Sequence, residues 1–356
     1  MTKLFARELS GCGPVRKKFN TATLMMEVTM HNASKQGDDN VGAMSADASR
    51  NPGSELHPDL QTLLKFYQEA RANPPESLLH RPGLIGSPSF FGIAELQRHL
   101  ANPLIQPNMI DVVFQGKKVP LEPACFYKIV QQKKLFFMDK RFIEEYLTRG
   151  ASVLLEGLDL LDPGINAFAA RLDAGFSCAL TNAEAFFSQQ ANEVYGGHLD
   201  TDDVLVIQLS GEKKWRLYNR QAPRMVNLVD LSPAQMGRQV AEFVLKPGDA
   251  LYVRSGVPHK CETPGSHSLH ISFDLCDRIP NINQTLEAGL ARYQEDCAPP
   301  YTPVAEVASR FAGLLQSDAF KAEMAQRTEA LSHDAKVFRE NIGNASQQGY
   351  LHRFMK

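Results

Sequence analysis

The stretch from residue 183 to about residue 277 constrains the fold of this chain more than any other part. Its apolar residues come in short or alternating runs, and Gly, Pro, Asp or Ser interrupts these runs at close intervals. Successive side chains of a strand point to opposite faces, so this texture is typical of an antiparallel barrel or sandwich. The sequence therefore predicts a fold of the α+β class with a mostly β core.

Helices and short strands are expected before this core. A helix with an apolar stripe begins near Pro58 and ends before the pair Pro74-Pro75, because proline interrupts a helix. The other expected elements are a helix over residues 93–99, two short strands around a Gly turn within residues 109–119, a helix over residues 137–149, a strand over residues 152–155, and a helix over residues 167–180.

The two ends of the chain differ from the core. Residues 1–53 are rich in Ser, Asn, Asp, Gly and Met, and we expect them to form a disordered tail. From Pro280 the pattern is helical, and its spacing favours core packing or a dimer face over a coiled coil. The apolar residues of this region form two stripes, Leu286, Leu290 and Tyr293, then Val304, Val307, Phe311 and Leu314. The expected divisions are therefore 1–53, 54–279 and 280–356.

Composition excludes little. The net charge of -2 singles out neither a membrane nor a nucleic-acid partner, so neither is expected. Six scattered cysteines without a CxxC pair indicate reduced thiols, and we expect a cytoplasmic protein. The sequence has no apolar run of transmembrane length, and its basic N-terminus lacks the apolar region of a secretory signal, although a transit peptide stays an alternative.

One constellation suggests a metal site. His198 and Asp200 stand two residues apart at the start of a strongly β-like run, where their side chains share a face. A Pro-Gly turn, a short strand and a second turn lead to His259, at a distance that returns the chain beside its earlier strand. Two histidines and one carboxylate leave part of a metal's coordination sphere open, as in non-haem iron(II) oxygenases. An HxD pair alone is weak, since both residues are common near turns.

Four stretches carry a resemblance to the Jumonji-C-type, cupin-like oxygenases, and specifically to their ribosomal-oxygenase branch. They are GASVLLEGL at 150–158, HLD at 198–200 with VLVIQLSGEKKWRLY at 204–218, LKPGDALYVRSGVPH at 245–259, and HSLHIS at 267–272. The resemblance implies a double-stranded β-helix, that is, a cupin or jelly-roll barrel, with flanking helices and a helical C-terminal appendage. It also implies a dioxygenase that uses Fe(II), 2-oxoglutarate and O₂, with the metal held by His198, Asp200 and His259.

The same resemblance suggests residues that bind 2-oxoglutarate. A basic residue two positions before a Trp grips the far carboxylate of 2-oxoglutarate in the family, and here that residue is Lys213, whereas Lys214 has the opposite strand parity and is expected in solvent. His270 matches a position near the metal. The family's Asn-x-Tyr-x-Thr run corresponds here to residues 184–188, where Phe186 replaces the Tyr and only Ser188 keeps a hydroxyl.

Three functions remain open at this point. The first is hydroxylation of a protein or peptide side chain, the second is hydroxylation of a small metabolite, and the third is binding without catalysis on a cupin-like scaffold. Fold alone does not decide among them. Members of the ribosomal-oxygenase branch that this chain resembles have both a dimerisation module and a winged helix. The helical region from residue 280 is long enough for a dimerisation bundle but too short for both, so the resemblance suggests a homodimer.

Overall fold

The computed structural model describes residues 56–176, 181–189, 196–222, 227–275, 282–296 and 303–347. The chain divides into two units, Met1–Arg50 and Asn51–Lys356, and all described residues belong to the second. The tail predicted over residues 1–53 therefore lies outside the described residues.

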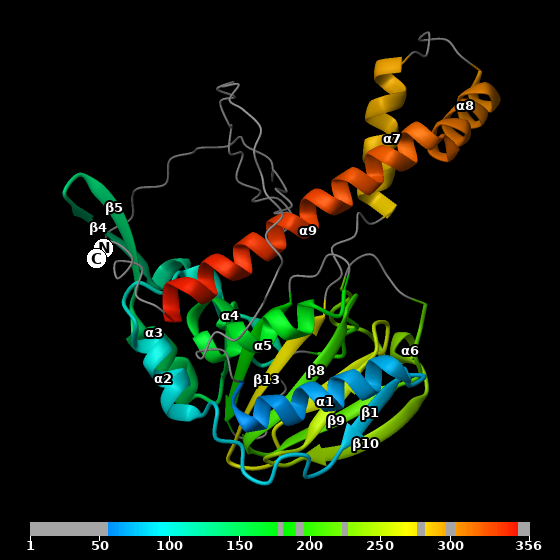
Figure 1. The fold of residues 1–356 in the computed structure, drawn as a ribbon. Coiled ribbons are helices and arrows are strands. Elements are labelled where there is room, and N and C mark those ends of the chain that lie inside the picture. The colour runs from blue at the N-terminus through cyan, green and yellow to red at the C-terminus, as the bar shows by residue number, and fades with distance from the viewer. Residues whose placement is uncertain are drawn as a thin grey trace, which may run out of the picture. The chain divides into compact units, whose positions relative to one another are not determined.

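An eight-stranded sheet forms the centre of the fold (Figure 1). Its strand order is β1-β11-β8-β13-β7-β6-β2-β3, and all neighbours pair antiparallel. The strands are β1 Leu78–Arg81, β2 Ile110–Phe114, β3 Lys117–Lys118, β6 Ser152–Leu155, β7 Asn182–Gln189, β8 Asp203–Gly211, β11 Ala250–Val253 and β13 His267–Leu275.

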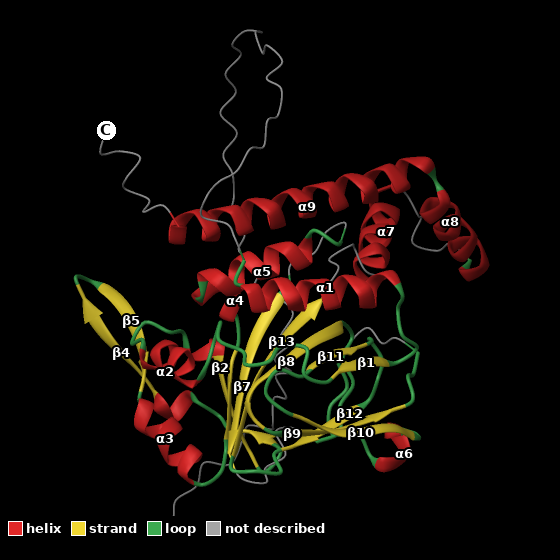
Figure 2. Cartoon of the chain, turned by 60° about the horizontal axis from the view of Figure 1, so that its bottom comes forward, coloured by secondary structure: helices red, strands yellow, loops and turns green. Residues whose placement is uncertain are grey.

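A second sheet faces the inner side of the first and closes a barrel (Figure 2). It has the order β10-β9-β12, with β9 Lys213–Tyr218, β10 Gln239–Leu245 and β12 His259–Glu262. Val206 of the large sheet is buried in one apolar cluster with Trp215 and Leu217 of the small sheet. The two inner faces thus share a core, and the predicted cupin-type barrel is confirmed.

The turn between β8 and β9 requires glycine. Gly211 has a φ of +62°, and a Cβ at this position would lie 2.0 Å from the carbonyl oxygen of His267 on β13. Any L side chain would clash with that backbone oxygen. The turn therefore passes close against β13 and starts β9 at Lys213, whose side chain is fully buried.

Helices cover the outer face of the large sheet. Phe168 of α5 packs edge-on against Phe273 of β13 at a centroid distance of 4.9 Å, and burying such a side chain contributes about 1.5–3 kcal/mol. The helices are α1 Pro58–Ala72, α2 Ile93–Ala101, α3 Lys140–Thr148, α4 Leu158–Leu161, α5 Pro163–Asp173, α6 Pro233–Met236, α7 Ile282–Asp296, α8 Val304–Gln316 and α9 Asp318–Gln347, with short 3-10 helices at Pro107–Met109 and Glu122–Ala124. Among the described helices, none has the length and hydropathy needed to cross a bilayer.

Most of the expected elements before the core are found, but two helix boundaries were wrong. The helix expected from residue 137 begins at Lys140, because residues 133–138 form a strand and Asp139 caps the helix by accepting a hydrogen bond from the backbone N–H of Arg141. The strand belongs to a hairpin of β4 Cys125–Val130 and β5 Lys133–Met138, which the sequence pattern did not reveal. Its side chains are mostly exposed on both faces, so it lacks the one-sided burial that the pattern would show.

The helix expected over residues 167–180 is displaced towards the N-terminus. α5 begins at Pro163, where Asp162 accepts hydrogen bonds from the backbone N–H groups of Gly164 and Ile165 at 2.9 and 3.0 Å. An acidic N-cap followed by proline is a strong start signal, and it outweighs the later apolar residues. α5 ends at Asp173, and residues 177–180 lie outside the described residues.

The helical character predicted after Pro280 is found in α7, α8 and α9. Arg339 of α9 binds residues of α4, α5 and the segment before β7, and its side chain is 6% exposed. Its Nε donates to Asp173 Oδ2 at 2.8 Å, its Nη1 donates to Asp159 Oδ2 at 2.5 Å, and its Nη2 donates to the carbonyl of Thr181. Asp159 also accepts a hydrogen bond from the backbone N–H of Ala183 at the start of β7, so one ion-pair network joins α9, α4, α5 and β7.

Candidate metal centre

His198 and His259 are brought together by their own backbones. The N–H of His198 donates to the carbonyl of His259 at 3.0 Å, and the N–H of His259 donates to the carbonyl of His198 at 2.8 Å. The expectation that the chain returns beside its earlier strand is thus met. The HxD pair itself does not lie on the strand as expected, because β8 begins only at Asp203. A backbone bond from Gly256 N–H to the carbonyl of Asp200, at 3.0 Å, holds this segment instead.

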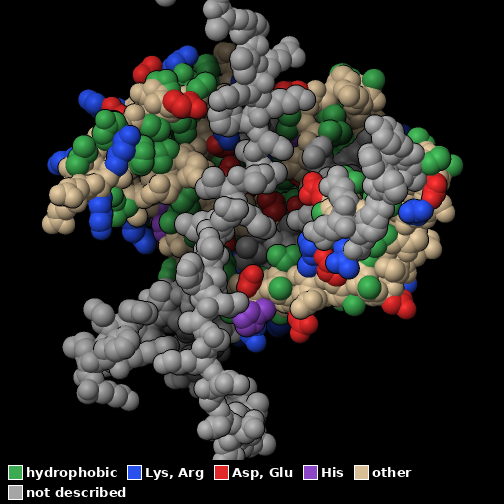
Figure 3. Space-filling model, turned by 90° about the horizontal axis from the view of Figure 1, so that it is seen from above, with side chains coloured by type: hydrophobic (Ala, Val, Ile, Leu, Met, Phe, Trp, Pro, Cys, Tyr) green, Lys and Arg blue, Asp and Glu red, His purple; other side chains and the backbone are tan. Residues whose placement is uncertain are grey.

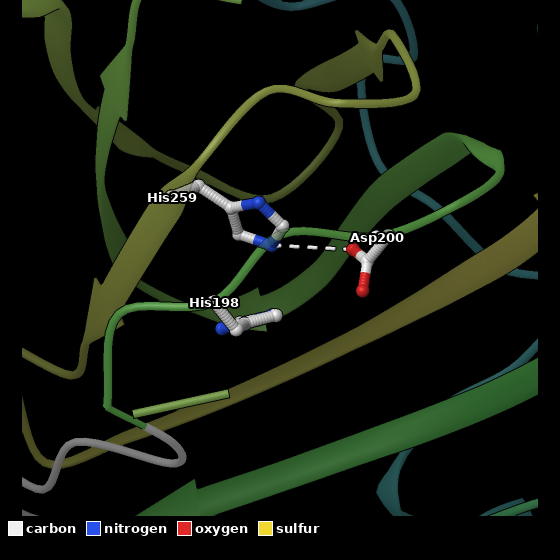
Figure 4. Close-up of side chains that lie close together, drawn as sticks. All are labelled: His198, Asp200 and His259. Carbon is white, nitrogen blue, oxygen red and sulfur yellow. Dashed lines mark ion pairs between the residues drawn. The ribbon is translucent and has the colours of Figure 1, made fainter. Parts of the chain in front are cut away.

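The three side chains converge on one point (Figure 4). One donor atom from each of His198, Asp200 and His259 lies within 4.8 Å of the others, and no other group of three His, Cys, Asp or Glu residues in the described part of the chain has this geometry. His259 Nε2 lies 3.6 Å from Asp200 Oδ2, and the two imidazole centroids are 4.0 Å apart. Two nitrogens and one carboxylate at this separation are the donor set of an open transition-metal site.

Hydrogen bonds fix which imidazole nitrogen faces the common point. Nδ1 of His198 contacts the carbonyl of Gly196 at 3.2 Å, and Nδ1 of His259 contacts the carbonyl of Val257 at 3.1 Å. A carbonyl oxygen only accepts, so each Nδ1 carries the proton and each Nε2 keeps the lone pair that a metal ligand needs. Burial, and then the neighbouring His198, lower the pKa of His259 to about 4, which keeps this ring neutral.

The deep end of the barrel holds an isolated cation. Lys213 is fully buried, and its Nζ donates to Ser188 Oγ and Thr263 Oγ1, each at 3.1 Å. Ser188 Oγ in turn accepts from Ser152 Oγ at 2.9 Å. Burial lowers the pKa of Lys213 to about 8, and no carboxylate contributes to that shift. Among the described residues this buried ammonium has hydroxyl partners alone, which is costly unless an anion joins it, and an ammonium has a third N–H to offer to one.

Two strands connect this cation to the triad. On β12, His259 and Cys261 are buried on the inner face, and Thr263 continues that face two residues later. β9 pairs antiparallel with β12, with His259 opposite Leu217 and Cys261 opposite Trp215. Lys213 lies two residues before Trp215 on the same inner face. The backbone register thus sets the separation between the triad and the ammonium.

Each remaining residue predicted for co-substrate binding also has its side chain on the inner face of the barrel. Ser188 contacts Lys213, as described above, and Lys214 points outward to Glu242 at 2.9 Å, as its parity implied. His270 is 4% exposed and stacks on Phe186 at a centroid distance of 4.8 Å. Its Nδ1 has no hydrogen-bond partner among the described residues, and burial followed by nearby Lys213 lowers its pKa well below the usual value.

Sequence reasoning missed Thr263, Ser152 and a group of carboxylates. Thr263 was detectable, because its distance of four residues from His259 places it on the same strand face. The carboxylates include Glu184 of β7 and Asp274 of β13, and Asn182 donates to Glu184 at 2.8 Å. Burial and the surrounding acids raise the pKa of Glu184 well above its usual value and that of Asp274 to about 7. Only the cross-strand register brings these acids together.

A family model, the JmjC domain, matches residues 160–284, about a third of the chain. This range contains His198, Asp200, Lys213 and His259. It leaves out the N-terminal helices and α8 and α9.

Curated relatives match over a similar part. The bifunctional lysine-specific demethylase and histidyl-hydroxylase NO66 of Aedes aegypti is 28% identical over 135 residues, which cover 36% of this chain and 21% of the relative. Ribosomal oxygenase 2 of Bos taurus is 40% identical over 78 residues, covering 21% of this chain and 17% of the relative. The chain therefore spans about a fifth of the length of these relatives.

Solved structures of similar fold include YcfD of Escherichia coli, which aligns over 74% of this chain and 69% of that chain at 17% identity and a TM-score of 0.47. A structure described as YcfD, a ribosomal oxygenase from Escherichia coli in complex with cobalt and 2-oxoglutarate, aligns over 74% and 70% at 16% identity, also with a TM-score of 0.47. From the matched family model, together with the motifs it contains, we conclude that this chain carries a JmjC domain over residues 160–284.

Proposed function

We propose that this chain is an Fe(II)- and 2-oxoglutarate-dependent dioxygenase that hydroxylates a side chain of a protein or peptide. The observation that carries the proposal is the pairing of an open three-ligand site with a buried ammonium inside one barrel. A metal site alone would fit many functions. A buried cation aligned with that site along two strands fits a small acid that binds the metal at one end and Lys213 at the other.

The triad fits iron by its chemistry. His198 and His259 present Nε2 atoms and Asp200 presents a carboxylate, which is the ligand set of non-haem iron(II) oxygenases. When bound, Fe(II) with 2-oxoglutarate and O₂ supplies the oxidising power for hydroxylation, while 2-oxoglutarate is converted to succinate and CO₂. The chain's own share is to orient the reactants and to exclude water.

Lys213, Ser188, Thr263 and His270 would bind the co-substrate. The Lys213 ammonium is held at a fixed position by two hydroxyls, so little conformational entropy is lost when a carboxylate arrives. Ser188 and Thr263 can rotate their hydroxyls to donate to the same carboxylate. The ring of His270 contacts Trp215, whose ring also stacks on His259, and its Nδ1, which has no partner among the described residues, can hydrogen-bond the acid.

A protein substrate is favoured by the names of the relatives, which describe a histidyl-hydroxylase and ribosomal oxygenases. That support concerns only the matched part, which is 36% of this chain and 21% of the first relative, and 21% and 17% for the second. Hydroxylation of a small metabolite and binding without catalysis are the competing outcomes.

One experiment separates these three functions. The protein with Fe(II), ascorbate and 2-oxoglutarate is incubated with cell lysate, and mass spectrometry searches for added oxygen on peptides and on metabolites. We expect oxygen on peptides, together with succinate release that His198→Ala abolishes. Modified metabolites without modified peptides would refute the protein substrate. Equal inactivity of wild type and His198→Ala, with no metal binding by either, would refute the oxygenase.

We also propose that the helical region from residue 280 mediates a homodimer. α8 has no buried residue, and Val304 is 85% exposed at its start. On α7, Leu290 is 51% exposed, and a groove between α7 and α9 is lined by Ala288, Met324 and other side chains. Exposed apolar stripes of this kind fit a second copy. Light scattering after size exclusion tests this, and a monomeric mass would refute it.

A further inference from the structure

The hairpin β4–β5 is exposed on both faces. In Figures 1 and 2 it projects away from the rest of the described chain. Three of the four exposed aromatic side chains in the described residues belong to it, namely Phe126, Tyr127 and Phe136, at 54%, 55% and 50% exposure. A two-stranded hairpin buries little surface of its own, and rings that stay exposed to water add little to its stability. An exposed aromatic cluster of this size therefore indicates a surface that meets a partner.

The hairpin is also purely basic. Between Cys125 and Met138 it carries Lys128, Lys133 and Lys134 and no Asp or Glu, whereas the whole chain has a net charge of -2. Figure 3 shows hydrophobic and Lys or Arg side chains side by side on the left lobe, where Figure 1 places β4 and β5. The hairpin is therefore positively charged although the chain as a whole has a small negative net charge, and its charge would complement an anionic partner.

The cross-strand register places rings and cations together on each face. Phe126 pairs with Phe137 on one face, at a centroid distance of 5.6 Å, and Tyr127 pairs with Phe136 on the other. Lys134 Nζ lies 3.9 Å from the centre of the Tyr127 ring. Aromatic faces flanked by ammonium groups are the combination that binds single-stranded nucleic acid, with bases on the rings and phosphates on the cations.

Two other partners fit less well. Beside the turn formed by Gln131 and Gln132, Lys133 and Lys134 pair with the exposed Val130 and Ile129, and the rings lie nearer the base of the hairpin. Insertion into a bilayer would bury those cations before any ring. A second copy of the same hairpin would bring like charges together.

We propose that β4–β5 binds single-stranded nucleic acid by stacking bases on its aromatic rings and pairing phosphates with its lysines. This proposal differs from the expectation, drawn from the net charge, that no nucleic acid is bound. This activity goes beyond the proposed oxygenase function and needs neither metal nor 2-oxoglutarate.

The test is fluorescence anisotropy of a labelled poly(U) oligonucleotide with the full chain, without metal, at several salt concentrations. Phe136→Leu keeps an apolar side chain but removes the ring, and it should weaken binding roughly fivefold to a hundredfold. Lys133→Gln with Lys134→Gln should lower the slope of log affinity against log salt by about 0.7 for each lysine in contact with phosphate. Lys65→Gln, on exposed Lys65 of α1, is the control and should change neither.

Several results would overturn the proposal. These are no binding of the oligonucleotide, binding that the hairpin variants leave unchanged, or binding of anionic phosphatidylserine vesicles in its place. Circular dichroism of each variant is the control that checks whether the chain is folded. Metal-dependent succinate release should be unchanged in all hairpin variants, so failure here and failure of the oxygenase proposal are read from separate assays.

Discussion

Replacement of Arg339 by alanine should destabilise the whole barrel unit, although Arg339 lies far along the C-terminal helix. Its guanidinium is 6% exposed and donates to Asp159, Asp173 and the carbonyl of Thr181. Alanine would leave two carboxylates enclosed without their cation. Removing one partner of a buried ion pair costs about 3–5 kcal/mol, mostly because the remaining charge is uncompensated. Total stabilities are about 5–15 kcal/mol, so this is a large share.

A matched control lies on the same helix. Arg327 pairs with Glu323 one turn away, but its side chain is 53% exposed, so Arg327→Ala should cost only about 0.5 kcal/mol or less. Arg339→Lys keeps the charge but loses the planar fork that reaches two carboxylates, and its cost should be intermediate.

Urea unfolding with two probes tests this reasoning. Circular dichroism reports on all helices, and fluorescence reports on Trp215, the only tryptophan, which is buried inside the barrel. Because Asp159 also binds the N–H of Ala183 on β7, both signals should shift to lower urea together in Arg339→Ala. If Arg339→Ala unfolded like Arg327→Ala, the buried network would not contribute as argued. If only circular dichroism shifted, α9 would not support the barrel.

Three further predictions concern the inside of the barrel. Lys213→Ala should weaken 2-oxoglutarate binding roughly tenfold to a hundredfold, since a charge-assisted hydrogen bond contributes about 1.5–3 kcal/mol. Lys214→Ala is the control and should not weaken it, and equal affinities of the two variants in calorimetry would disprove the assignment. Co(II) at a hundred times its dissociation constant should add about 2.7 kcal/mol of stability, seen as a higher Tm that His198→Ala abolishes; the same rise in His198→Ala would show binding elsewhere. Burial and nearby acids raise the pKa of Asp274 to about 7 in the folded state, so between about pH 4 and 7 the folded state binds more protons than the unfolded state. The free energy of unfolding should therefore fall as pH rises through this window. Asp274→Asn should flatten this dependence, and an unchanged slope in urea titrations at several pH values would count against it.

Much of the candidate metal site could be predicted from the sequence because its determinants are local. His198 and Asp200 stand beside each other in the chain, and the Pro-Gly turn before His259 marks the returning strand. The strand parity of Lys213 and Lys214 correctly separated the buried lysine from the exposed one. The barrel was likewise visible in the spacing of its turns.

The rest depends on contacts between distant segments. Asp159 and Arg339 meet across 180 residues, and neither has a local pattern that names the other. Glu184 and Asp274 become neighbours only through the pairing of β7 with β13. The hairpin β4–β5 escaped because alternation carries information only when one face is buried, and both of its faces are exposed.

The pairing of β9 with β12 would also make the barrel selective for the length of the acid that it binds. His259 begins β12 and Thr263 directly follows its end, a span of roughly 13 Å between Cα atoms if the backbone stays extended, and Lys213 contacts Thr263 at the far end. A one-residue slip would turn every inner side chain outward, so this span cannot drift by small steps. If the triad and Lys213 hold the two ends of 2-oxoglutarate, as proposed, an oxo acid one methylene shorter or longer would fit this span less well. Selectivity among such acids would then reside in the backbone pairing, and no single side chain would have to recognise the middle of the molecule.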